Sequence, residues 1–207
     1  HWHLEYPQIF SKGGFDVLVG NPPWDLVQTD QTREDEFFFR KVKEWFKCGP
    51  YEILKGRRDF YKLFVLMAKN LLPERGRLSF VVPIGMFIEG EDSLALRQNL
   101  YQDGSIIALQ HYQNSRQSFF SNVHASYRFV VFLYSPSREY KHRFSTVIHA
   151  PNEIGKESWI EVNRDEFQKK LSSDLAARMY PDIQYASLHM NIMDRLHSLL
   201  PLKYDVT

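Results

Sequence analysis

The stretch that decides the fold is Phe15-Asp16-Val17-Leu18-Val19-Gly20-Asn21-Pro22-Pro23-Trp24. Its first part is an apolar run with the composition of a buried strand, and Gly20 closes that run. The two prolines that follow lack the N–H groups that a sheet ladder needs, so we predict that the strand ends at Asn21. The tetrapeptide then lies at the carboxyl end of a strand, where open α/β sheets bind their ligands.

The residue types of this turn suit a planar ring that carries an exocyclic amino group. Asn21 supplies an amide oxygen, and Pro22 supplies a carbonyl oxygen without a regular ladder partner. Each oxygen can accept one N–H of the same amino group, while Trp24 offers a flat apolar face for stacking. An amine held in this way turns its lone pair toward an electrophile such as a sulfonium methyl. Orientation and dipoles then replace a strong base as the source of catalysis.

The turn resembles motif IV, (D/N)-P-P-(Y/F/W), of the S-adenosylmethionine-dependent amino-methyltransferases. The lead-in His1-Trp2-His3-Leu4-Glu5-Tyr6-Pro7, followed by Gly14-Phe15-Asp16, extends the likeness. The whole run is similar to N6-adenine DNA methyltransferases, and within these to the methylase parts of type IIG restriction–modification enzymes. The likeness covers residues 1–150. The alternative is a Pro-Pro turn that merely ends a strand.

Patterns downstream predict further elements. Apolar residues at helical spacing predict helices over 34–46 and 58–72, and 78–83 reads as a short buried strand. The strand over 15–20, the helix over 58–72 and this strand form a βαβ unit with parallel strands. A helix over 94–102 follows, with Ser93 as its N-cap. Further strands are predicted at 105–112, 125–134, 144–149 and 159–162, and further helices at 164–172 and 187–200.

The predicted fold class is therefore α/β. The strands 105–112 and 125–134 are joined by a loop too short for a crossover helix, so we expect them to be antiparallel. The resemblance implies the C-terminal half of a Rossmann-like methyltransferase sheet, with parallel strands that end in an antiparallel hairpin and a helical tail after them. We expect residues 1–150 to form the catalytic half of the domain. Residues 151–207 would lead to a target-recognition domain outside the sequence.

The loop over 113–122 resembles motif VIII, in which an aromatic side chain packs against a flipped target base. Its register places that role on Phe120, with Phe119 as the fallback. The base would stack between Trp24 and Phe120, and each face is worth about 1–3 kcal/mol by analogy with single-strand binders. Extrusion is needed because the N6 atom in a duplex is closed to in-line attack. The alternative is that both phenylalanines belong to the core.

The remaining candidate residues have these predicted roles. Asn21 and Pro22 orient the amino group, Pro23 shapes the turn near the sulfonium, and Arg116 and Arg128 are candidate phosphate contacts. No Gly-rich nucleotide loop occurs in the sequence. We therefore expect most of the S-adenosylmethionine site to lie upstream of His1, with contacts from Asn21 and Pro23. A fragment of this kind is expected to bind the cofactor poorly and to be inactive.

Composition supports a globular protein of 207 residues with 43% hydrophobic residues. The single cysteine allows no internal disulfide or cysteine-based metal cluster, and no metal site is expected. No signal peptide or membrane-spanning apolar run occurs, which favours a cytoplasmic protein. Net charge is only +1. Residues 31–75 and 113–143 are nevertheless basic, and they would form either a phosphate-facing surface or an ordinary mixed-charge surface.

These observations predict a site-specific DNA methyltransferase that acts on adenine N6 in double-stranded DNA and forms part of a restriction–modification system. A restriction-endonuclease domain or subunit is an expected partner. Methylation of cytosine N4, of an RNA base or of a glutamine side chain uses similar chemistry and stays open. A non-catalytic DNA-binding module of the same fold is the alternative from another class.

Overall fold

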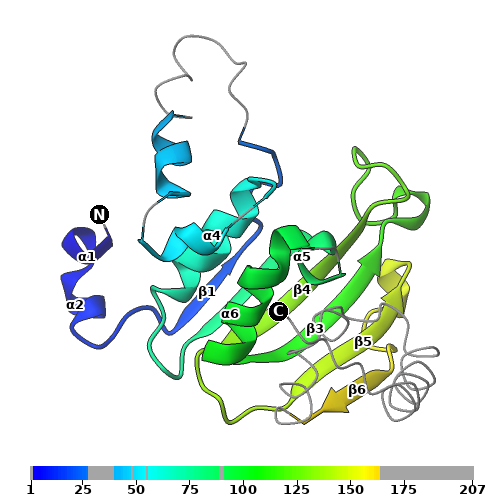
Figure 1. Ribbon diagram of the computed structural model, residues 1–207. Helices are drawn as coiled ribbons and strands as arrows, with labels where there is room; N and C mark the ends of the chain where they lie inside the picture. Colours follow the sequence, from blue (N-terminus) through cyan, green and yellow to red (C-terminus); the bar gives the residue numbers. More distant parts are fainter. Residues whose placement is uncertain (1, 28–39, 48, 55, 89–90, 164–207) are drawn as a thin grey trace, which may run out of the picture.

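The computed structural model describes residues 2–27, 40–47, 49–54, 56–88 and 91–163 (Figure 1). They form a mixed α/β fold on one six-stranded sheet. Its strands are β1 Val17–Gly20, β2 Arg77–Pro83, β3 Ser105–Gln113, β4 Arg128–Ser135, β5 His142–Ile148 and β6 Trp159–Val162. The helices are α1 Trp2–Glu5, α2 Pro7–Phe10, α4 Phe60–Lys69, α5 Gly85–Ile88 and α6 Leu94–Asp103. Short 3-10 turns are η1 Gly49–Ile53, η2 Glu91–Ser93, η3 Ser115–Gln117 and η4 Pro151–Glu153.

The strand order is β1-β2-β4-β3-β5-β6. Strands β1 and β2 are parallel, and the chain passes between them through α4, so the predicted βαβ unit is confirmed. Strand β4 is antiparallel to both of its neighbours, β2 and β3. The predicted antiparallel hairpin of β3 and β4 is therefore confirmed. It does not end the sheet, however, because β5 pairs with β3 and β6 pairs with β5.

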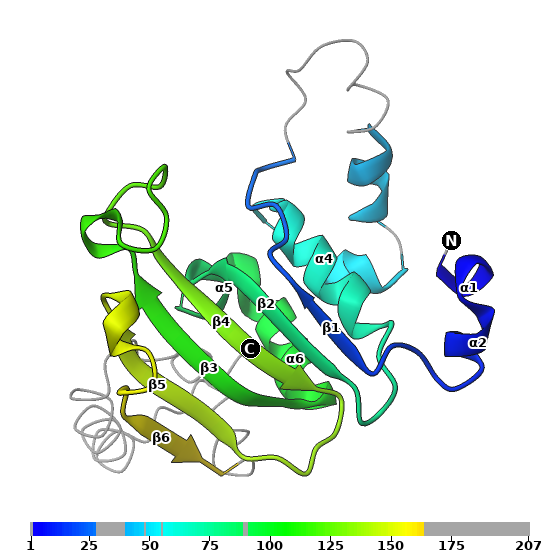
Figure 2. The same cartoon turned by 180° about the vertical axis from the view of Figure 1, so that it is seen from behind.

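The helices α4, α5 and α6 lie on one face of the sheet (Figures 1 and 2). Burial alternates along β2, where Leu78, Phe80 and Val82 are buried in the main core. This alternation is the strand period of two, with one face turned to the helices. A second, smaller core contains Tyr112, Phe129 and Ile148. The partly buried side chains packed against this second core are Trp24, Val81, Phe119, Phe120 and Val131.

The prediction that the first strand is buried is wrong. Val17 and Val19 in β1 are 60% and 76% exposed. The physical reason is position, because β1 stands at the edge of the sheet and β2 is its only neighbour among the described strands. The apolar composition of a strand shows that it suits a sheet, but burial requires elements on both sides.

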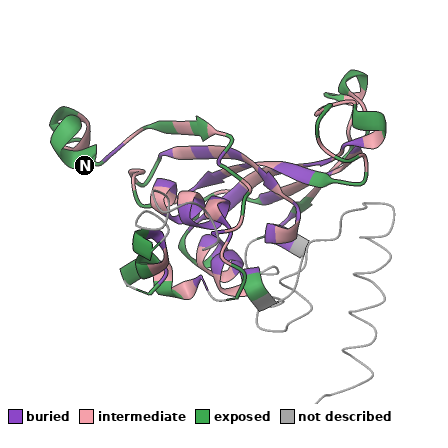
Figure 3. Ribbon diagram, turned by 90° about the horizontal axis from the view of Figure 1, so that it is seen from above, coloured by how far each residue is buried: buried purple, intermediate pink, exposed green. Residues whose placement is uncertain are grey.

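Element boundaries shift by a few residues from the predicted ones. Strand β4 begins at Arg128 rather than at residue 125, and α4 spans Phe60–Lys69 rather than 58–72. Ser93 does precede α6, but its side chain makes no capping hydrogen bond. The predicted lead-in contains α1 and α2, whose residues are mostly exposed (Figure 3).

Other predicted elements lie partly or wholly outside the described residues. Residues 40–45 of the helix predicted over 34–46 are helical, and residues 34–39 lie outside the described residues. The helices predicted over 164–172 and 187–200, and with them the helical tail, also lie outside. The boundary predicted at residue 150 stays a prediction.

The Gly-Gly turn before β1 has a steric cause. Gly14 has φ +130°, and a Cβ at this residue would lie 2.3 Å from the Leu71 carbonyl oxygen. That carbonyl accepts a hydrogen bond from the Phe15 amide at 2.9 Å. Only glycine lets the chain pass this close to the end of α4, which starts β1 in register with β2.

Candidate functional site

The turn after β1 contains two hydrogen-bond acceptors that have no donor among the described residues. Asn21 and Pro23 are exposed, whereas Pro22 is buried. No described residue donates a hydrogen bond to the Asn21 side chain or to the Pro22 carbonyl. The pairing of Gly20 with Phe80 is the last step of the β1–β2 ladder. The two prolines therefore end the ladder and leave both oxygens without a hydrogen-bond donor from the described residues.

Trp24 is a fixed aromatic plate beside this turn. Its Nε1 donates a hydrogen bond to the Val81 carbonyl oxygen of β2 at 3.2 Å. Its ring lies 6.3 Å from the Phe129 ring at an interplanar angle of 38°. A hydrogen bond at one end and an aromatic neighbour at the other restrict the orientation of the indole.

The chain after Trp24 is tied to the start of α4. The Phe60 amide donates to the Asp25 carbonyl at 3.0 Å, and the Val27 amide donates to the Arg58 carbonyl at 2.8 Å. An isolated bridge pairs Leu26 with Asp59. Backbone contacts from α4 thus hold the far end of the turn, and β1 holds its near end.

A buried ion pair stabilises the same junction. Lys62 Nζ lies 3.1 Å from Asp59 Oδ2, and the two side chains are 2% and 4% exposed. The ammonium also donates to the Arg57 carbonyl oxygen at 2.8 Å and to the Asp92 carbonyl oxygen at 3.5 Å. Arg57 Nε donates to the other Asp59 oxygen at 2.9 Å. The two buried charges are compensated, as burial requires.

The β3–β4 loop contributes an aromatic cluster on the second face of the sheet. Phe120 meets Trp24 edge to face, with ring centroids 6.1 Å apart at 76°. Phe120 also contacts Phe129 at 5.0 Å, and Phe119 contacts Tyr112 at 5.3 Å. Burial, and after it the Glu157 carboxylate, raises the pKa of the Tyr112 hydroxyl, which therefore stays neutral near pH 7.

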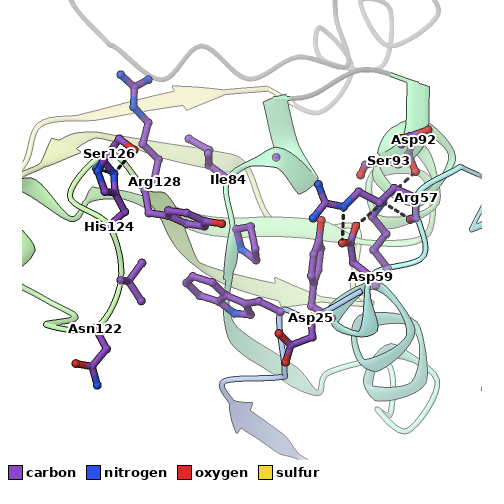
Figure 4. Close-up of a pocket in the computed structure, with 17 residues that line it drawn as sticks. Asp25, Arg57, Asp59, Ile84, Asp92, Ser93, Asn122, His124, Ser126 and Arg128 are labelled. Carbon is purple, nitrogen blue, oxygen red and sulfur yellow. Dashed lines mark hydrogen bonds and ion pairs between the residues drawn. The ribbon is translucent and has the colours of Figure 1, made fainter. Parts of the chain in front are cut away.

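A cavity of about 1000 Å³ opens beside Trp24. One wall comes from the start of α4 and from η2, with Arg57, Asp59 and Asp92, and the opposite wall comes from His124, Ser126 and Arg128 (Figure 4). Arg57 and Arg128 belong to the two basic segments of the sequence, so the fold brings part of both to one cavity.

The structure brings some of the predicted site residues together. Trp24 and Phe120 are in direct contact, and Arg128 shares the cavity with Trp24. Arg116 is exposed on η3 and is not among the residues that line the cavity. Phe119 packs against Tyr112, and the Phe129 ring contacts both Phe119 and Trp24. The functional roles of these residues stay predictions.

Sequence reasoning missed two parts of the site. Asn114 is fully buried and bonds the loop that carries Phe120. Asp59 and Lys62 carry opposite charges three residues apart at the start of a helix, which was a readable signal for an ion pair. The sequence does not predict their burial, because that burial depends on the packing of η2 and of the turn after β1.

The described residues contain neither a metal-binding cluster nor a membrane-spanning helix. No group of three or more His, Cys, Asp or Glu side chains is arranged to hold a metal ion in these parts of the chain. Within the same residues, no helix combines the length and the apolar composition that a bilayer span needs.

Comparison with known protein families decides the relationship of this chain. The model of the Eco57I restriction-modification methylase family matches residues 1–119. The chain belongs to this family. The matched region contains β1, the turn after it, α4, β2 and β3, together with Phe119 in the loop. The likeness to restriction–modification methylases read from the Asn-Pro-Pro-Trp turn is thereby confirmed.

Curated relatives of this Eco57I-family chain are also restriction–modification proteins. The type II methyltransferase M.TthHB8I of Thermus thermophilus is 33% identical over 90 residues, which are 44% of this chain and 20% of the relative. A protein of Methanocaldococcus jannaschii named for a type II restriction enzyme and methyltransferase is 28% identical over 101 residues, 49% of this chain and 7% of the relative. The chain therefore spans a fifth or less of the length of these relatives.

Solved structures support the fold of this Eco57I-family chain. The type IIG restriction endonuclease BpuSI matches with a TM-score of 0.54 at 13% identity, over 89% of this chain and 22% of that chain. The DrdV–DNA complex matches with a TM-score of 0.50 at 14% identity, over 77% of this chain and 18% of that chain. At these identities the likeness concerns the fold alone.

Proposed function

We propose that this chain is the catalytic part of a site-specific DNA methyltransferase that transfers a methyl group to N6 of a flipped adenine. The proposal includes the finer description of the fold, the C-terminal half of a Rossmann-like methyltransferase sheet. One observation carries it. The oxygens of the Asn21 side chain and the Pro22 carbonyl, which have no described hydrogen-bond donor, lie at the carboxyl end of β1 beside Trp24, whose indole is bonded to β2.

The two oxygens suit an exocyclic amino group. Asn21 Oδ1 accepts one N–H and the Pro22 carbonyl accepts the other, which turns the nitrogen lone pair out of the plane of the base. S-adenosylmethionine, implied by the family, supplies the electrophilic methyl group. The two oxygens would hold the amino nitrogen in line with that methyl group, and the proton that the methylated nitrogen then loses would leave to water. Asn21 and Pro23, both exposed at this edge, are the described residues that fit contacts to the donor.

Entry of a base requires a local rearrangement. The Trp24 and Phe120 rings contact each other edge to face, so a ring sandwiched between them needs one of the two to move. Trp24 is bonded to β2 through Nε1. We therefore propose that the Phe120 side chain rotates to admit the base and then stacks on it. Phe119, anchored against Tyr112, is the less suited of the two.

Double-stranded DNA is the proposed partner. The cavity next to Trp24 combines Arg57 and Arg128 from the two basic segments, and Arg128 is exposed at the first residue of β4. Guanidinium groups at a cavity mouth suit phosphates that flank an extruded nucleotide. Arg116 is a second, more distant candidate for a phosphate contact. A restriction-endonuclease domain or subunit completes the proposed system.

The experiment uses the natural full-length protein that contains this sequence. It is incubated with S-adenosylmethionine labelled in the methyl group and with mixed-sequence duplex DNA, and the DNA is then digested to nucleosides. Label in N6-methyladenine is the expected result. Label in N4-methylcytosine would keep the mechanism and change the base. Parallel incubations replace the DNA with RNA or with protein. Label in one of these alone, or DNA binding without any label, would replace the proposal with one of its alternatives.

Substitution of Trp24 separates stacking from anchoring. Trp24→Phe keeps a stacking face and loses the hydrogen bond to Val81, so we expect methyl transfer to fall only about 2- to 10-fold, the equivalent of one hydrogen bond of about 0.5–1.5 kcal/mol. Trp24→Ala also loses the stacking face, which is worth about 1–3 kcal/mol. Its rate of methyl transfer is therefore expected to be about 5- to 150-fold below that of Trp24→Phe. Initial rates on methylatable DNA measure both. Equal rates for the two variants would show that Trp24 does not stack on the base.

A further inference from the structure

Asn114, the first residue after β3, has every hydrogen-bonding position of its side chain occupied. It is 0% exposed. Its Oδ1 accepts from the amides of Phe119 and Phe120 at 3.1 and 3.0 Å. Its Nδ2 donates to the carbonyl oxygens of Phe120 and Val123 at 2.9 and 2.8 Å. Only a primary amide offers two donors and an acceptor of this size.

These bonds fix the main chain of Phe120 from both sides, since its amide and its carbonyl both end on the same side chain. The backbone of Asn114 closes the loop as well. Its amide donates to the Tyr127 carbonyl at 2.9 Å, and its carbonyl accepts from the Gln117 amide at 2.8 Å. The loop is thus built around one buried amide.

The loop includes backbone that few residues adopt. Arg116 and Gln117 have φ of 53° and 56°, in the left-handed region. Such residues cost free energy and persist where surrounding contacts determine the conformation. The bonds of Asn114 are contacts of this kind, because they hold the chain immediately after η3.

We propose that Asn114 is a positioning residue for methyl transfer, which holds the backbone of Phe120 so that its ring alone swings against the target base. The inference rests on the proposed function, since it acts through Phe120. The fixed backbone leaves rotation of the side chain as the way in which Phe120 admits a base opposite Trp24. Preorganisation of this kind raises the rate because the loop need not be ordered when the base arrives.

The experiment compares Asn114→Ala, Phe120→Ala and the double variant in the natural full-length protein, on a duplex that the wild type methylates. Phe120→Ala is expected to lower kcat about 5- to 150-fold through loss of one stacking face. Asn114→Ala should lower kcat within the same range and leave the affinity for S-adenosylmethionine unchanged. If Asn114 acts through Phe120, the double variant falls no more than about 2-fold below Phe120→Ala, whereas independent residues give multiplied effects. Multiplied effects would overturn the proposal.

A second readout does not depend on activity. Amide hydrogen exchange at Phe119 and Phe120 should accelerate at least 10-fold in Asn114→Ala, because their N–H groups lose their acceptor. Asn152→Ala, the same change at an exposed residue of η4, is the matched control and should alter neither exchange nor rate. Unchanged exchange in Asn114→Ala would also refute the positioning role.

Two further arms keep the test decisive. Asn114→Asp keeps the acceptor for both amides. Its second oxygen faces the carbonyls of Phe120 and Val123, and burial favours the protonated carboxyl, which donates to one of them. This variant therefore replaces Asn114→Ala in the rate comparison if the alanine variant does not fold. It should retain slow exchange at Phe119 and Phe120 and a rate between those of the wild type and Phe120→Ala. Absence of methylation by the wild type would reject the proposed function itself, and the exchange measurement would then still report on the loop.

Discussion

Asn21→Ala is expected to lower the rate of methyl transfer about 10²- to 10³-fold, the usual effect of removing one preorganised polar group from a reaction site. The amide oxygen of Asn21 is one of two acceptors that we propose for the amino group. Without it the lone pair is no longer aimed at the methyl carbon. Initial rates with labelled S-adenosylmethionine and duplex DNA measure the effect.

The exposure of Asn21 makes this test clean. No described residue hydrogen-bonds to its side chain. The free energy of unfolding of the alanine variant should therefore differ from that of the wild type by less than about 0.5 kcal/mol. Asn21→Asp keeps an acceptor, in agreement with the (D/N)-P-P-(Y/F/W) pattern, and should lose less activity than the alanine variant. Asn152→Ala serves as the control at an exposed residue of the same type. A fully active Asn21→Ala variant would remove Asn21 from the mechanism.

Asp59→Ala should reduce the free energy of unfolding by about 3–5 kcal/mol. It leaves the ammonium of Lys62, which is 2% exposed, without its carboxylate. It also frees Arg57, whose Nε donates to the same carboxylate. Urea denaturation followed by circular dichroism measures the change, provided that the transition has two states.

A surface ion pair of the same spacing is the matched control. Lys41 and Glu44 lie 3.1 Å apart at positions i and i+3, with side chains 52% and 54% exposed. Glu44→Ala should cost less than about 1 kcal/mol, because water already screens this pair. Asp59→Leu combined with Lys62→Met should recover most of the loss, since no unpaired charge remains buried. Equal losses for Asp59→Ala and Glu44→Ala would contradict the assigned burial.

Local patterns predicted those parts of the fold whose partners are close along the chain. The βαβ unit of β1, α4 and β2 followed from apolar spacing and from the Pro-Pro stop. The antiparallel pairing of β3 with β4 followed from loop length alone. What local patterns missed was the position of β4 between β2 and β3, because the choice of a second neighbour is made across the sheet.

The candidate site divides in the same way. The Asn-Pro-Pro-Trp turn and Phe120 were found from residue types and from the resemblance that they carry. The edge-to-face contact of Trp24 with Phe120 was not predicted. A stacking role for both rings predicts two parallel rings separated by the width of a base, and the structure has the two rings in direct contact. The role of Asn114 could not be predicted either, because the residues around an asparagine in a polar loop do not indicate whether its side chain is exposed or buried.

The sequence by itself determined the family, the end of β1 and the chemistry of the turn after it. These depend on proline, asparagine and tryptophan as chemical groups, whose properties hold wherever the chain places them. Only the tertiary structure decided that β1 stands exposed at an edge, that Asp59 and Lys62 are buried beside the turn, and that Asn114 bonds the loop of Phe120. Burial and hydrogen-bond partners arise from segments far apart in the chain, so no local pattern records them.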